Sequence, residues 1–79
     1  MDSNVRDVVR RELPGRLKNR RRKLSIPQKQ LADAAGVCVE TICGYEKGKR
    51  IPPADVTAAM ARELRVSCEW LMGLEDGQR

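Results

Sequence analysis

Two short helical patterns separated by three residues occupy positions 28–47, QKQLADAAGVCVETICGYEK. Leu31 and Ala35 lie one turn apart in the first pattern, and Ile42 begins the apolar face of the second. Gly36 stands between them, and glycine is the residue that most readily ends a helix with a left-handed backbone. A connection this short forces the two helices to cross steeply, which is helix-turn-helix geometry.

The rest of the chain also has helical spacing, and no stretch alternates as a β-strand does. Pro52-Pro53 is expected to open a helix whose apolar face ends at Leu64, and Ser67 is expected to cap a short helix that Gly73 ends. The fold class predicted is therefore all-α, a compact five-helix bundle. The other helices are expected over 16–24, 28–35, 39–47 and 68–72.

The N-terminal segment carries apolar residues at Val5, Val8 and Val9 behind a candidate cap, Ser3. Pro14-Gly15 is expected to break or kink the helix there. At 79 residues the chain is long enough for one domain with a modest core. We expect an N-terminal extension over 1–15 that can add a helical turn, one domain over 16–74 and a flexible tail over 75–79.

Positive charge is concentrated in the first half of the chain. There are 16 Lys and Arg against 11 Asp and Glu, a net charge of +5, and residues 41–79 hold six of each sign. Six of the eight residues from Arg16 to Lys23 are basic. A one-sided basic surface indicates a polyanionic partner, either nucleic acid or an anionic membrane surface.

Several classes of protein are disfavoured by composition. The chain has no histidine, which removes imidazole chemistry, so an enzyme is not expected. Its three cysteines have no CxxC spacing and predict neither a disulfide framework nor a zinc site, and we expect no metal and no cofactor. No apolar run approaches the ~18 residues of a membrane span and no signal peptide is present, so we expect a cytoplasmic protein.

Four segments in order, RLKNRRRKL, QKQLADAAGV, ETICGYEKGKRIP and ARELRVSCEWLMG, carry a family resemblance. From about Arg16 to Leu74 the chain resembles the Cro and repressor type of phage and bacterial helix-turn-helix regulators, the Xre-like family. The resemblance implies a lambda-repressor-like domain of five helices. It also implies binding to double-stranded operator DNA, usually as a homodimer.

The resemblance also explains an arginine in an apolar stripe. Arg21 lies between Leu17 and Leu24 on the core-facing side of its helix. In the family, an arginine of the first helix often pairs with a glutamate of the third, and Arg21 and Glu46 occupy those places. Glu46 lies one turn beyond Ile42 and so points inward as well. We expect a structural ion pair between Arg21 and Glu46.

The outward face of the helix at 39–47 is the surface that such a domain places in the major groove. Val39 and Cys38 are suited to a thymine methyl group, and Glu40 can accept a hydrogen bond from cytosine N4. By resemblance, Val39, Glu40 and Gly44 match base-contact positions of the family. The predicted base-contact residues are Cys38, Val39, Glu40, Cys43 and Gly44.

Phosphate contacts are expected beside that face. Gln28 starts the preceding helix, where the family's glutamine bonds a phosphate near the positive end of the helix dipole. The full set predicted is Gln28, Lys29, Thr41, Lys47, Lys49, Arg50 and Arg20. The chain departs from the family at two helix caps, where Pro27 and Cys38 replace the usual hydroxyl residues, and both helix ends are expected to fray more as a result.

Three functions fit these features. The favoured one is a sequence-specific DNA-binding transcriptional regulator, a repressor, encoded by a bacterium or phage. The first alternative is an antitoxin or other protein-interaction module that binds a toxin or regulatory partner and binds DNA only secondarily. The second is a peptide at a membrane surface, built on the arginine-rich helix.

Overall fold

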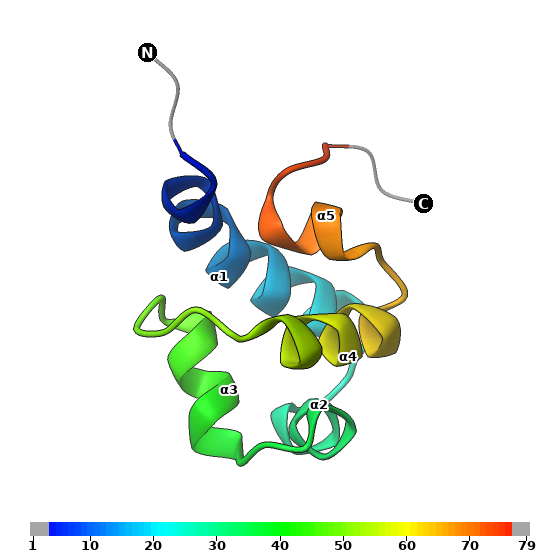
Figure 1. The fold of residues 1–79 in the computed structure, drawn as a ribbon. Helices are drawn as coiled ribbons and strands as arrows, with labels where there is room; N and C mark the ends of the chain where they lie inside the picture. The colour runs from blue at the N-terminus through cyan, green and yellow to red at the C-terminus, as the bar shows by residue number, and fades with distance from the viewer. Residues whose placement is uncertain (1–3, 77–79) are drawn as a thin grey trace.

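The computed structural model describes residues 4–76, which form five α-helices and contain no strand (Figure 1). The predicted all-α architecture is confirmed. The helices are α1 (Val5–Lys23), α2 (Gln28–Ala35), α3 (Val39–Glu46), α4 (Ala54–Leu64) and α5 (Cys68–Met72). The second and fifth helices have the bounds expected from the sequence, and α3 ends one residue earlier because Lys47 is its C-cap.

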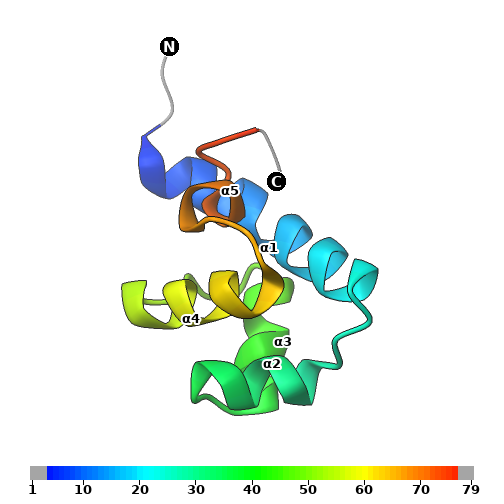
Figure 2. The same cartoon turned by 90° about the vertical axis from the view of Figure 1, so that its right-hand side faces the viewer.

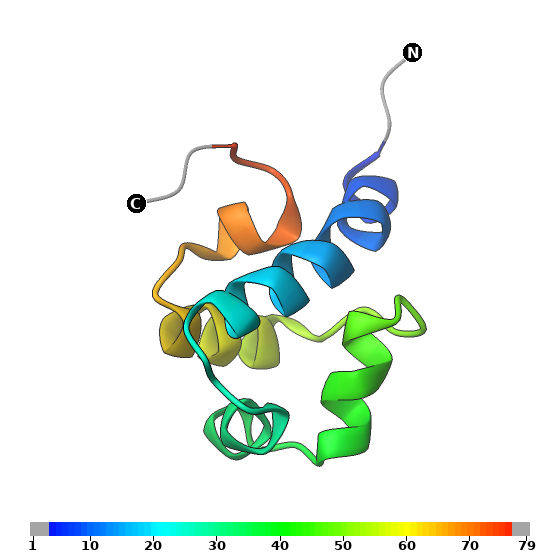
Figure 3. The same cartoon turned by 180° about the vertical axis from the view of Figure 1, so that it is seen from behind.

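The five helices enclose one hydrophobic core. α2 packs on α3 and α4, while α1 packs on α3 and α5, so α1 and α4 separate α5 from the α2–α3 pair (Figures 1 and 2). Seen from behind, α2 is viewed nearly end-on beside the lower end of the upright α3, so the two helices are steeply inclined to each other (Figure 3). Seven large side chains are fully buried: Leu13, Leu17, Leu31, Ile42, Met60, Leu64 and Leu71. None of the described helices is both long enough and apolar enough to cross a membrane.

The prediction that Pro14-Gly15 breaks the first helix is wrong. α1 is one helix of 19 residues with Pro14 inside it. An internal proline costs about 3 kcal/mol, but Leu13 and Leu17 on either side of it are buried in the core. Packing therefore holds the helical turn in place despite the proline. The backbone at Gly48, in the loop after α3, lies against the Pro14 ring, with 3.5 Å between the ring Cγ and the position of a Cβ at Gly48.

The cap at the start of α1 also differs from the expectation. Ser3 lies outside the described residues, and the N-cap is Asn4, whose Oδ1 accepts a hydrogen bond of 2.9 Å from the Asp7 N–H. A short polar side chain at this position satisfies one of the donors that a helix start leaves open. The apolar side chains that follow do not all reach the core, since Val9 is buried while Val5 is exposed.

Caps and turns at the α2–α3 junction follow the sequence closely. Gly36 ends α2 with a φ of +72°, which few other residues adopt without strain. Neither Pro27 nor Cys38 makes a side-chain cap hydrogen bond, as their residue types suggest. The Ser67 hydroxyl, by contrast, accepts from the Trp70 N–H at 3.0 Å and caps α5.

Candidate nucleic-acid interface

A buried ion pair fixes α3 relative to α1. Arg21 Nε lies 2.6 Å from Glu46 Oε2, and a second bond of 3.2 Å joins Arg21 Nη2 to Glu46 Oε1. The side chains are only 12% and 4% exposed. Arg21 Nη1 also donates to the Ile26 carbonyl at 3.0 Å, and Gln28 Nε2 donates to Glu46 Oε1 at 3.1 Å. The pair expected from the sequence is present, and it joins α1, α3 and the start of α2.

The side chains of α3 divide into an inner and an outer set. Ile42 and Tyr45 are buried, whereas Glu40 and Lys47 are exposed on the other side of the helix. Cys38 is exposed, and Val39, Cys43 and Gly44 are partly exposed, with Val39 also packing against the edge of the core. The described part of the chain therefore leaves the five predicted base-contact positions at least partly open to solvent.

Gly44, on the outer side of α3, faces the side chain of Arg50 from the loop before α4. A Cβ placed on Gly44 would lie 3.5 Å from Arg50 Cγ, 3.6 Å from Cδ and 3.9 Å from Nε. The same arginine influences Tyr45: burial raises the pKa of the tyrosine hydroxyl, and the positive charge of Arg50 partly offsets that rise. The distances to Gly44 place the Arg50 side chain along α3.

A basic groove of about 280 Å³ lies beside α3. Its walls are Lys18, Arg21, Arg22, Gln28, Cys43, Glu46 and Lys47. Since Glu46 neutralises Arg21, the excess charge comes from Lys18, Arg22 and Lys47, none of which forms an ion pair within residues 4–76. Lys18 was not predicted as a contact residue. The i, i+4 spacing of Lys18 and Arg22 would have indicated that both lie on one face of α1.

The structure does not bring Arg20 to this surface, which corrects its prediction as a phosphate contact. Arg20 Nε donates to the Leu64 carbonyl, the last of α4, at 2.9 Å. Arg16 acts similarly on α5, because its Nη1 donates to the Trp70 carbonyl at 2.7 Å and its guanidinium lies 5.1 Å from the Trp70 ring centroid. Both arginines place positive charge at the negative end of a helix dipole and join α1 to its neighbours.

The other predicted phosphate-contact residues lie near α3 or at the start of α2. The Gln28 amide is held by its bond to Glu46, and Lys29 forms an exposed i, i+4 pair with Asp33 at 3.4 Å. Thr41 Oγ1 lies 3.1 Å from the sulfur of Cys38. Lys47 and Lys49 are exposed at the carboxyl end of α3.

Comparison with known proteins agrees with this geometry. The sequence profile of a family described as helix-turn-helix matches residues 17–71, which spans α2, α3 and the helices that support them. The chain belongs to the Xre-like helix-turn-helix family. The resemblance found in the sequence is thereby confirmed.

One curated relative of this helix-turn-helix chain is an "Uncharacterized HTH-type transcriptional regulator YobD" of Bacillus subtilis (strain 168). The two sequences are 33% identical over 61 residues, which is 77% of this chain and 54% of the relative. The chain thus spans about half the length of that regulator. No solved structure matches it significantly.

Proposed function

We propose that this protein is a sequence-specific double-stranded DNA-binding transcriptional regulator that acts as a repressor and reads the major groove with α3. The observation that carries the proposal is the open outer face of α3, a helix that the buried Arg21–Glu46 pair fixes relative to α1. A rigid helix with one face buried and the other free is what groove insertion requires. Membership of the helix-turn-helix family supports the same function.

Base contacts come from the outer face of α3 and its N-cap. The Val39 and Cys38 side chains offer apolar contact to thymine methyl groups, and the exposed Glu40 carboxylate accepts from cytosine N4. Cys43 adds a small side chain on the same face, and Gly44 adds none. These five residues are proposed to provide the sequence preference.

Phosphate contacts surround that face on three sides. At the start of α2, where the helix dipole is positive, phosphates of one DNA strand are contacted by Gln28 and Lys29. Further phosphates are contacted from α3 and its carboxyl end by Thr41, Lys47 and Lys49. From α1, Lys18 and Arg22 extend the set across the basic groove. These contacts position the protein and provide most of the salt-dependent affinity.

A homodimer on a palindromic operator is part of the proposal. A single domain of this size buries too little surface on DNA for high affinity, whereas two copies on half-sites about 34 Å apart double the contacts. A bacterial or phage-encoded protein of this kind would act in the cytoplasm.

Selection of bound duplexes from a random pool, at two salt concentrations, tests the function directly. We expect a palindromic consensus, with affinity falling by roughly 0.9 log units per log unit of salt for each phosphate contacted. With about four to six phosphates per subunit, the loss between low and moderate salt should be steep. No preferred sequence, together with affinity that ignores salt, would instead favour a protein-interaction role such as an antitoxin.

Thiol modification tests which surface meets DNA. In variants that keep one cysteine and carry serine at the others, iodoacetamide at Cys43 should abolish binding because it adds bulk to the outer face of α3. The matched control keeps Cys68, which is also partly exposed but lies on α5. Equal DNA binding by both modified proteins, with folding checked by circular dichroism, would show that α3 does not face the duplex.

A further inference from the structure

The centre of the outer face of α3 has no side chain of its own. Ile42 and Tyr45 point into the core, which leaves Glu40, Gly44 and Lys47 on the opposite side of the helix. Gly44 lies one turn after Glu40 and three residues before Lys47, between the two. A glycine inside a helix costs about 1 kcal/mol relative to alanine, so its presence at this position calls for an explanation.

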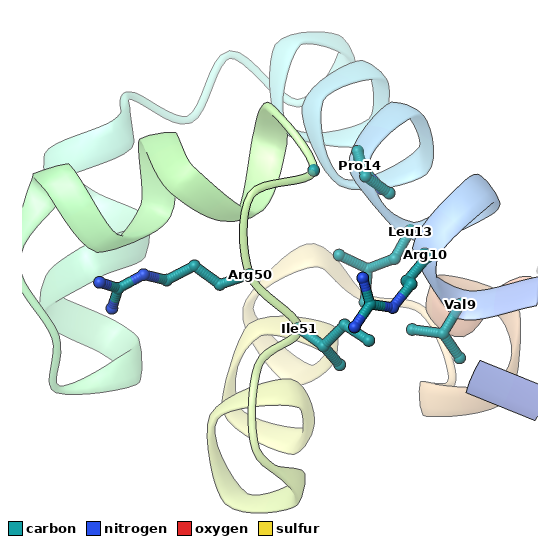
Figure 4. A pocket seen from close by; sticks show the side chains of 7 residues that line it. Val9, Arg10, Leu13, Pro14, Arg50 and Ile51 are labelled. Carbon is teal, nitrogen blue, oxygen red and sulfur yellow. The ribbon is translucent and has the colours of Figure 1, made fainter. Parts of the chain in front are cut away.

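The loop after α3 returns the chain along the helix and places Arg50 over this gap. Gly48 adopts a φ of +76°, and the Lys49 N–H donates to the Gly44 carbonyl at 2.9 Å, which closes the carboxyl end of α3 as a Schellman motif. The next residue, Arg50, then lies with Cγ and Cδ 3.5 and 3.6 Å from the Cβ position of Gly44. Figure 4 shows its side chain running beside α3, while Ile51 and Leu13 lie on the other side of the loop.

The guanidinium of Arg50 has no partner in the described part of the chain. Residues 4–76 contain no ion pair and no hydrogen bond of the Arg50 side chain, and the residue is exposed. The aliphatic part of the Arg50 side chain is therefore positioned by packing on Gly44, and its guanidinium is available to bind a ligand.

We propose that Arg50 is a specificity-determining residue that takes the place of the missing side chain at Gly44 and reads a guanine in the major groove. A planar fork with several N–H donors matches the O6 and N7 acceptors of guanine, the commonest specific contact that arginine makes to a base. The proposal rests on the function proposed above. It moves Arg50 from the phosphate-contact set to the base-contact set.

The base preferences of four proteins test this assignment: the wild type, Arg50→Ala, Arg50→Lys and the matched control Lys49→Ala. We expect Arg50→Ala to lose about 10- to 100-fold of discrimination for guanine at one position of each half-site, with other positions unchanged. Arg50→Lys keeps the charge but not the fork, so most of that discrimination should also disappear. Lys49→Ala should weaken every duplex by the same factor and lower the salt dependence.

A fifth variant, Gly44→Gln, tests the role of the gap. A glutamine side chain would occupy the position of the Arg50 stem, so guanine preference should be lost although Arg50 is still present. Retained guanine preference in this variant, or uniform weakening of all duplexes by Arg50→Ala, would overturn the inference and return Arg50 to the phosphate set. A wild-type protein that selects no sequence would overturn the proposed function itself, so the two failures are distinguishable.

Discussion

Removal of Arg21 should be far more damaging than removal of an ordinary surface charge. The Glu46 side chain is 4% exposed beside Arg21, and in the Arg21→Ala protein its carboxylate would lose its charged partner and keep Gln28 as a neighbouring donor. The Ile26 carbonyl would also lose a hydrogen bond. Breaking a buried pair from one side costs about 3 to 5 kcal/mol. The whole free energy of unfolding for a chain of this length is about 4 to 12 kcal/mol, so this single change should remove a quarter of it or more.

Removal of both partners should cost less than the sum of the two single changes. In Arg21→Met with Glu46→Leu, no charge is left buried and both replacements add apolar surface to a region that adjoins the core. Replacing buried pairs with apolar residues of similar volume is often neutral or stabilising. The double-mutant cycle of the Met and Leu substitutions should therefore show a coupling energy of about 2 kcal/mol or more.

Urea denaturation followed by far-ultraviolet circular dichroism measures these differences. The matched control is Lys29→Ala, which breaks an exposed i, i+4 pair whose side chains are 78% and 69% exposed and should cost no more than about 0.5 kcal/mol. If Arg21→Ala costs as little as the control, or if the two single losses simply add, the pair does not behave as a buried charge pair and the argument is wrong.

Four further predictions concern individual residues. Gly73→Ala should destabilise the fold by more than about 2 kcal/mol in thermal unfolding, because Gly73 has a φ of +85° and the new Cβ would overlap Glu12 Cβ. An unchanged melting temperature would contradict this close packing of α5 on α1. Cys38→Ser should raise the free energy of unfolding, measured by urea denaturation, by about 0.5 to 1 kcal/mol, because serine supplies the missing hydroxyl cap of α3. A lower free energy of unfolding would show that the thiol is preferred at this position. Burial holds the pKa of Tyr45, the single tyrosine, above its usual value of 10.0, so the free energy of unfolding should decrease as the pH rises past 10. Arg50→Ala should raise this pKa further in an ultraviolet titration of the free protein, and no change would place Arg50 away from α3.

The apolar stripe on the first helix shows that Arg21 needs a partner, and the family resemblance identifies Glu46 as that partner. Most of the helices, by contrast, were predictable because local signals determine them. Gly36 and the apolar spacing around it mark the two helices of the motif. Ser67 is a strong cap by residue type alone. In these cases the sequence preference and the tertiary structure favour the same conformation, so the pattern is sufficient.

The remaining features depend on contacts between distant segments. Pro14 reads as a helix breaker, and only the burial of its neighbours keeps α1 continuous. The alignment of Arg50 with Gly44 arises from the path of a loop, which residue spacing along the chain does not reveal. Arg20 is one of several adjacent basic residues, and its neighbours in the sequence give no indication that it binds the end of α4.

The helix-end contacts of Arg16 and Arg20 have a practical consequence for anyone who alters this protein. Basic residues that are close together on α1 perform unrelated tasks, because Arg16 and Arg20 bind helix ends whereas Lys18 and Arg22 line the groove. Alanine scanning of the whole stretch would therefore mix unfolding with loss of binding. Variants intended to weaken nucleic-acid binding without affecting folding should be made at Lys18 and Arg22, whose side chains line the open groove. The same substitutions at Arg16 and Arg20 would loosen the scaffold and leave the docking surface chemically intact.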